Sequence, residues 1–175
     1  MTPPGCQCID AARLIPPGAN VNDVDYQNYG GLAVVHRQTI TCHKMTLDVA
    51  VTTFEYLFCH ATAASRHFVL LAVYRPGSQA LSTAFFDELS AVFECIATYG
   101  CPVVVFGYFN VHVDKSDDRH TVRLAQLLQL FDCVQHVAEP THGAGHTLDL
   151  VITTTVARRI LRLLICTSAT RWYYL

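Results

Sequence analysis

Short apolar runs separated by turn-forming residues follow one another along most of the chain. Runs of β-branched and aromatic residues bounded by glycine, proline or small polar residues are typical of β-strands. The run at residues 103–106 is apolar at every position, as in a strand buried on both faces. The pattern predicts strands at residues 32–35, 54–61, 67–74, 103–106 and 148–155, with residues 133–137 as a further candidate.

Two of these strands lie close together in the sequence. A small-residue turn around Ala64 and Ser65 separates residues 54–61 from residues 67–74. The two segments are therefore predicted to form a β-hairpin or to be neighbouring strands. Pro76 follows the second segment and stops it, since proline cannot donate a hydrogen bond to the next strand.

Two other segments have the three- and four-residue spacing of apolar positions that indicates an amphipathic helix. The first covers residues 85–96, with Ser82 as a possible N-cap and Gly100 just past the end. The second is predicted at residues 118–131, capped by Asp117 or Asp118. Its buried side is predicted to carry Val122, Ala125, Leu128 and Phe131.

Strands and helices are mixed along the chain, some strands being joined by short turns and others by helices. This order predicts a layered α/β or α+β domain, with two sheets packed face to face and helices outside. The regular strand–helix alternation of a doubly wound parallel sheet is missing, and no internal repeat is visible.

Composition and charge narrow the function only a little. The chain has 175 residues, 51% of them hydrophobic, and a formal net charge of −2, so no overall basic field attracts nucleic acid. The one visible basic cluster is Arg158, Arg159 and Arg162. No stretch is long and apolar enough to span a membrane, and the first residues do not resemble a signal peptide, so an intracellular location is expected.

The eight cysteines are expected to be free thiols in a reducing compartment. Cys6 and Cys8 form a C-x-C pair, and Cys42 and Cys59 each precede a histidine. None of these pairs has the full spacing of a zinc-binding motif, so a structural role for the cysteines is favoured.

Polar residues that follow buried strands are candidates for a functional site, because a rigid sheet can position them. They occur in residues 74–76, 107–110 and 147–151. Asp149 lies within an apolar strand and needs a partner if it is buried. A structural hydrogen bond would satisfy it as well as a catalytic role would.

The order of these segments resembles the endonuclease/exonuclease/phosphatase superfamily, in the branch that non-LTR retrotransposons encode. The likeness covers residues 14–153, and it rests on an ordered set of motifs rather than on any one of them. The matching segments are Gly30-Gly31-Leu32, Phe54-Glu55-Tyr56-Leu57, Tyr74-Arg75-Pro76-Gly77, Phe85-Phe86-Asp87-Glu88-Leu89, Phe109-Asn110-Val111-His112, Glu139-Pro140-Thr141-His142 and His146-Thr147-Leu148-Asp149.

This resemblance implies a four-layered α/β sandwich, with two facing mixed sheets and outer helices, that is incomplete at both ends. The partial domain is assigned to residues 1–155, and residues 156–175 are a tail without family likeness. The tail is interpreted as the product of a shifted reading frame or an aberrant splice, and a short basic amphipathic helix on a partner or membrane surface is the alternative. The implied ancestral activity is Mg²⁺-dependent cleavage of phosphodiester bonds in DNA. DNA is therefore the implied partner, and the oligomeric state and metal ligands are left open.

The resemblance also assigns roles to individual residues. Tyr74 matches a tyrosine beside the phosphate, and Asn110 matches an asparagine that orients the phosphate or the attacking water. Asp149 matches an aspartate that orients a late histidine. His112 and His142 recur in the family pattern, and we interpret them as structural. Packing of Tyr74 on Pro76 and a turn at Asn110 are the alternative interpretations of those two residues.

Departures from the family pattern predict impaired catalysis. Tyr108 stands where the family has the aspartate that acts as base, and a phenol with a pKa near ~10 is a poor base at neutral pH. The strand with the metal-binding glutamate is missing, and Glu55 is expected to be a surface residue instead. No Asp, Glu or His follows Asp149. The alternatives are a non-catalytic DNA- or protein-binding remnant and a relic that does not fold stably.

Overall fold

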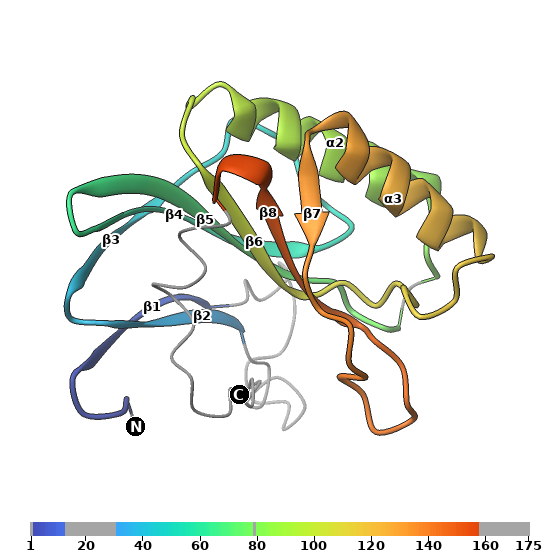
Figure 1. Ribbon diagram of the computed structural model, residues 1–175, viewed down its shortest axis with the longest axis horizontal. Helices are drawn as coiled ribbons and strands as arrows, with labels where there is room; N and C mark the ends of the chain where they lie inside the picture. The colour runs from blue at the N-terminus through green and yellow to red at the C-terminus, as the bar shows by residue number, and fades with distance from the viewer. Residues whose placement is uncertain (1, 13–30, 79, 158–175) are drawn as a thin grey trace, which may run out of the picture.

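The computed structural model describes residues 2–12, 31–78 and 80–157 (Figure 1). Its centre is a six-stranded sheet in the order β3-β4-β5-β6-β8-β7. The strands are β3 (Ile40–Met45), β4 (Glu55–Ala63), β5 (Arg66–Tyr74), β6 (Val103–Tyr108), β7 (Cys133–Gln135) and β8 (Asp149–Thr154). Strands β5 and β6 are parallel, and the other neighbours are antiparallel.

The helices α2 (Thr83–Ala97) and α3 (Arg119–Leu130) lie together over one face of this sheet (Figure 1). Helix α2 is the crossover that the parallel pairing of β5 and β6 requires. Its buried face carries Phe85, Phe86, Leu89, Val92, Phe93 and Ile96, the same residues whose spacing predicts the helix. No helix in the described part of the chain is long and apolar enough to cross a membrane.

A two-stranded antiparallel sheet, β1 (Cys6–Ala12) and β2 (Gly31–Arg37), packs on the opposite face. Alternate residues of β2 are buried, and Leu32 and Val34 join an apolar cluster with residues of β4 and β5. The predicted arrangement of two sheets with helices is thus confirmed. Among the described residues, the helices cover only the larger sheet, and the smaller sheet is purely antiparallel.

Three details differ from the sequence-based expectations. The strands β1 and β3 are additional, and the short 3₁₀ turn Thr155–Ala157 follows β8. Strand β6 continues through Gly107 instead of ending there. In α3 the buried residues are Leu124, Leu127 and Leu128, whereas Val122 is 43% exposed. The rest of the predicted tail, residues 158–175, lies outside the described residues, as does the basic cluster.

Candidate functional site

Four residues stand side by side across the sheet at one end. The strand register pairs Glu55 with Tyr74, Tyr74 with Tyr108, and Tyr108 with Asp149. Residues directly opposite each other on neighbouring strands project from the same face of a sheet. Tyr74 packs against the apolar cluster beneath β1 and β2, so this strand-end row faces the smaller sheet. Glu55, expected at the surface, is half-buried in the row.

The two tyrosines of the row form a stacked pair. Their ring centroids lie 6.0 Å apart at an interplanar angle of 28°. Burial raises the pKa of Tyr108, and the nearby Asp149 carboxylate and Tyr74 raise it further, against the opposing effect of Arg75. The Tyr108 phenol therefore keeps its proton at neutral pH.

Gly107 allows β6 to pair closely with β5 next to the row. Its φ of +133° is rare for residues with a side chain, and a Cβ built on it would lie 2.0 Å from the Val73 carbonyl oxygen. The absence of a side chain lets β6 pair with β5 up to Tyr108, so that its ring stands beside that of Tyr74. The glycine thus serves a close approach between two backbones.

Asn110 lies just past the same end of β6. Its backbone is left-handed, with φ of +52°, a conformation that asparagine tolerates better than most residues. The buried Arg75 holds this turn, since its Nε donates to the Phe109 oxygen at 3.0 Å and its Nη2 to the Asn110 oxygen at 3.2 Å. A Cβ on Gly77 would lie 2.9 Å from Asn110 Nδ2, so the Asn110 amide packs over this glycine.

Asp149 begins β8, and its backbone is fixed by the preceding loop. The Thr141 hydroxyl accepts hydrogen bonds from the backbone N–H groups of Leu148 and Asp149, each at 2.9 Å. The Phe109 N–H donates to the Leu148 oxygen at 3.0 Å, which ties this loop to the end of β6. The structure therefore brings Tyr74, Tyr108 and Asp149 together in the row and places Asn110 at the same end.

The two carboxylates of the row lie too far apart to bind one Mg²⁺ together. Mg²⁺ prefers several oxygen ligands in octahedral geometry. The two carboxylates of the row, on Glu55 and Asp149, are separated by three strand spacings of about 4.8 Å, which puts their strands roughly 14 Å apart. That distance is too long for one ion to bridge, and two stacked tyrosines lie between them.

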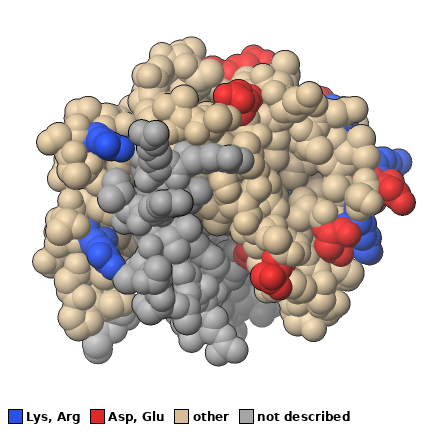
Figure 2. All heavy atoms as spheres, viewed as in Figure 1, with Lys and Arg blue, Asp and Glu red and all other residues tan. Residues whose placement is uncertain are grey.

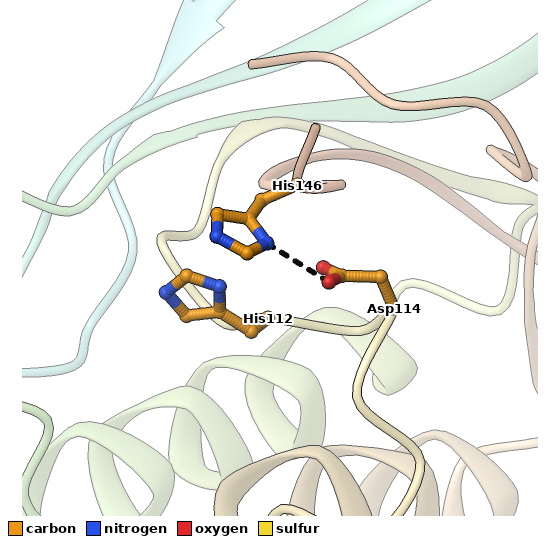
Figure 3. A group of neighbouring side chains, drawn as sticks. All are labelled: His112, Asp114 and His146. Atoms are coloured by element: carbon orange, nitrogen blue, oxygen red, sulfur yellow. Dashed lines mark hydrogen bonds and ion pairs between the residues drawn. The ribbon is translucent and has the colours of Figure 1, made fainter. Parts of the chain in front are cut away.

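A second group of side chains lies in the loops next to the row (Figure 3). His112 and Asp114 follow β6, and His146 precedes β8. One ligand atom from each residue lies within 4.8 Å of the others, the only such group of three or more His, Cys, Asp or Glu in the described ranges. Sequence reasoning missed this cluster, and interpreted His112 as structural, because 32 residues separate Asp114 from His146.

Hydrogen bonds join Asp114 to the loop that carries His146. The Asp114 carboxylate contacts His146 Nδ1 at 3.0 Å and accepts from the Thr147 N–H at 3.0 Å. These contacts lower the pKa of Asp114 to about 2, and the contact with His146 has the largest effect. The His112 ring packs edge-on against His146 with centroids 4.4 Å apart, and burial lowers the pKa of His112. The cluster thus combines a carboxylate with two imidazoles, one of them favoured in its neutral form.

Charged side chains of the described residues form no basic patch on the face that Figure 2 shows. On the face shown in Figure 2, acidic and basic residues are few and interspersed among uncharged ones. Of the described basic residues, Arg75 is buried among backbone carbonyls and Arg123 pairs with Asp87 at 2.8 Å. The visible described surface offers no broad electrostatic track for a nucleic-acid backbone.

Solved structures share this architecture. The catalytic domain of human nocturnin, determined with a bound sulfate anion, aligns with 17% identity over 86% of this chain and 61% of its own, with a TM-score of 0.57. The chain has the endonuclease/exonuclease/phosphatase fold. Proteins of that name from Bacteroides thetaiotaomicron and Leptotrichia buccalis align with TM-scores of 0.59 and 0.52, at 12% and 8% identity, each over 86% of this chain and 60% of the other.

The chain therefore spans about three-fifths of the length of these structures. No protein-family model matches it, and no curated protein sequence does either. At such low identity the likeness establishes the fold, and the chemistry has to be argued from the residues of this chain.

Proposed function

We propose that this chain is a retrotransposon-derived domain whose ancestor cleaved DNA phosphodiester bonds with Mg²⁺, and that it no longer does so at the strand-end row. The observation that carries the proposal is Tyr108, whose ring lies between Tyr74 and Asp149 at the end of β6. By the sequence resemblance, this is the position of the aspartate that activates the attacking water.

Tyr108 cannot replace that aspartate for two reasons. A general base at neutral pH needs a pKa near the working pH, whereas burial and Asp149 raise the pKa of this phenol above its usual value. The ring also stacks on Tyr74 and occupies the space beside it. Loss of the base and loss of room for water act at the same position.

The remaining residues keep an arrangement suited to binding a phosphodiester. In this proposal Tyr74 and Asn110 contact the phosphate, and Asp149 is the remnant of the pair that oriented a histidine. Support comes from the way the fold fixes them, since Arg75 holds the Asn110 turn and Thr141 holds the start of β8. The sulfate bound by human nocturnin shows that a related fold accepts a tetrahedral anion.

The retrotransposon origin is proposed from the ordered motifs of the sequence, and DNA is the partner that this origin implies. With a net charge of −2 and no basic patch on the visible described surface, we expect DNA binding to be weak and strongly reduced by salt.

A small diester tests the chemistry apart from DNA binding. Purified protein is incubated with bis(4-nitrophenyl) phosphate and either Mg²⁺ or Mn²⁺, and release of nitrophenol is followed by absorbance. We expect no turnover above the metal-only blank. Metal-dependent turnover that the Asn110→Ala variant abolishes would overturn the proposal, because it would place an active site at the strand-end row.

A further inference from the structure

The cluster of His112, Asp114 and His146 has a feature that a purely structural role leaves unexplained. The hydrogen bonds of Asp114 to His146 and to Thr147 are sufficient to tie the two loops together. Within the described ranges, however, Nδ1 of His112 is buried and has no hydrogen-bond partner. Buried polar nitrogens are nearly always paired, so this one calls for a proton acceptor, a donor or a metal ion.

We propose that His112, Asp114 and His146 form a site for a divalent transition-metal ion, with Zn²⁺ as the ion that fits best. The three side chains point toward one another from two loops (Figure 3), and their ligand atoms lie within 4.8 Å of one another. Ligands around tetrahedral zinc stand roughly 3.3 Å apart, given metal–ligand distances of ~2.0–2.1 Å. His146 Nδ1 and Asp114 already lie 3.0 Å apart, so the approach of the His112 ring is the main adjustment that an ion would require.

The ligand types select the ion. Two imidazoles and one carboxylate suit Zn²⁺ and neighbouring transition metals, whereas Mg²⁺ and Ca²⁺ prefer oxygen ligands throughout. Three protein ligands would leave a fourth position for water or another ligand. The His146 and Asp114 side chains are 30% and 27% exposed, so solvent reaches the cluster. The hydrogen bond from Thr147 N–H to the second oxygen of Asp114 is the kind of support that orients a metal-binding carboxylate.

This inference is independent of the proposed function, since it uses none of the residues of the strand-end row. It also differs from the cysteine-based pairs that the sequence raises, because no thiol takes part. Its test can therefore fail while the proposed function stands, and the reverse holds as well.

The experiment is a Zn²⁺ titration of full-length protein without a histidine tag, stripped with a chelator and kept reduced. Isothermal titration calorimetry gives stoichiometry and affinity, and Co²⁺ absorbance reports the ligand types. We expect one Zn²⁺ per chain. Affinity should fall by at least about 100-fold in His112→Ala and in Asp114→Asn, because even losses of supporting residues cost ~10–100-fold.

His142→Ala is the matched control, since His142 lies in the same loop as His146. In the described structure, the one hydrogen bond seen for the His142 ring comes from the Ala144 N–H. It should bind Zn²⁺ as the wild type does. His112→Ala removes no hydrogen bond seen for its ring in the described structure and should keep its fold, which circular dichroism checks. X-ray absorption on the zinc-loaded wild type identifies the ligands without any variant.

Three results would overturn the inference. One is the absence of Zn²⁺ binding at one equivalent, and another is binding that His112→Ala and Asp114→Asn leave unchanged. The third is a sulfur ligand, seen as a sulfur-to-cobalt charge-transfer band or in the absorption fine structure, which would assign the metal to cysteines.

Discussion

Replacing Gly107 with alanine should destabilise the protein severely, because this position sets the approach of β6 to β5. The added Cβ would lie 2.0 Å from the Val73 oxygen and 3.0 Å from the Val73 nitrogen and carbonyl carbon. Only backbone atoms are involved, so no side chain can rotate away. Relief requires β6 to move away from β5 in the interior of the six-stranded sheet.

The expected magnitude follows from two contributions. A side chain at the Gly107 φ of +133° costs of order 1–3 kcal/mol of backbone strain. Overpacking against a fixed neighbour adds about 1–3 kcal/mol. The free energy of unfolding should therefore fall by roughly 2–6 kcal/mol, a large part of the ~5–15 kcal/mol typical of a folded domain.

Urea unfolding followed by circular dichroism measures this loss. With a slope of ~1–3 kcal/mol per molar urea, the transition midpoint should fall by at least about 0.7 M, or the variant should not fold. Gly100→Ala is the matched control. Gly100 also has a positive φ, +60°, but its Cβ would meet open space, so the cost should be about 1–2 kcal/mol. Equal midpoints for the two variants would refute the argument from close approach.

Three further predictions concern charges and caps. The Glu88 carboxylate accepts four hydrogen bonds from Thr52 and Thr53, which outweigh burial and lower its pKa below the ordinary 4.5. Glu88→Gln should therefore lower the free energy of unfolding by about 1–2 kcal/mol at neutral pH. The difference in stability between the variant and the wild type should vanish as the pH falls through the lowered pKa of Glu88, and urea unfolding at several pH values measures it. Asp118→Ala should lower the urea midpoint in the same assay, since Asp118 caps α3 by accepting hydrogen bonds from the His120 and Thr121 N–H groups. Tyr108→Asp should lower the free energy of unfolding by about 1–3 kcal/mol at neutral pH, because it replaces a stacked ring with a carboxylate opposite Asp149. Part of this loss should be recovered in acid, where the carboxylates are protonated. A variant as stable as the wild type would contradict the described row.

The parts of the fold that the sequence predicts are those with strong local periodicity. Helix α2 carries a wide apolar face, and β6 is apolar from Val103 to Phe106, so both were predictable from the chain alone. Strands β1 and β3 were missed because their residues are mostly exposed or half-buried and mix polar with apolar side chains. Gly107 was interpreted as a strand end, since glycine ends many strands and its contact with Val73 is tertiary.

The residues of the candidate site also differ in how far the sequence predicts them. The resemblance predicts Tyr74, Asn110 and Asp149 as site residues through an ordered set of motifs, and the register explains why Tyr74, Tyr108 and Asp149 meet. Their roles stay predictions. The cluster around Asp114 was invisible in the sequence, because its spacing follows no metal-binding motif and its members meet only through the folding of two loops.

A plasmid nicking assay tests the central claim, that the strand-end row no longer hydrolyses DNA, most directly. Wild type, Asn110→Ala and Tyr108→Asp are incubated with supercoiled plasmid and Mg²⁺ or Mn²⁺. All three should leave the plasmid supercoiled, since the base is replaced by Tyr108 and restoring one member of a catalytic unit recovers little. Metal-dependent nicking by the wild type that Asn110→Ala abolishes would contradict the account.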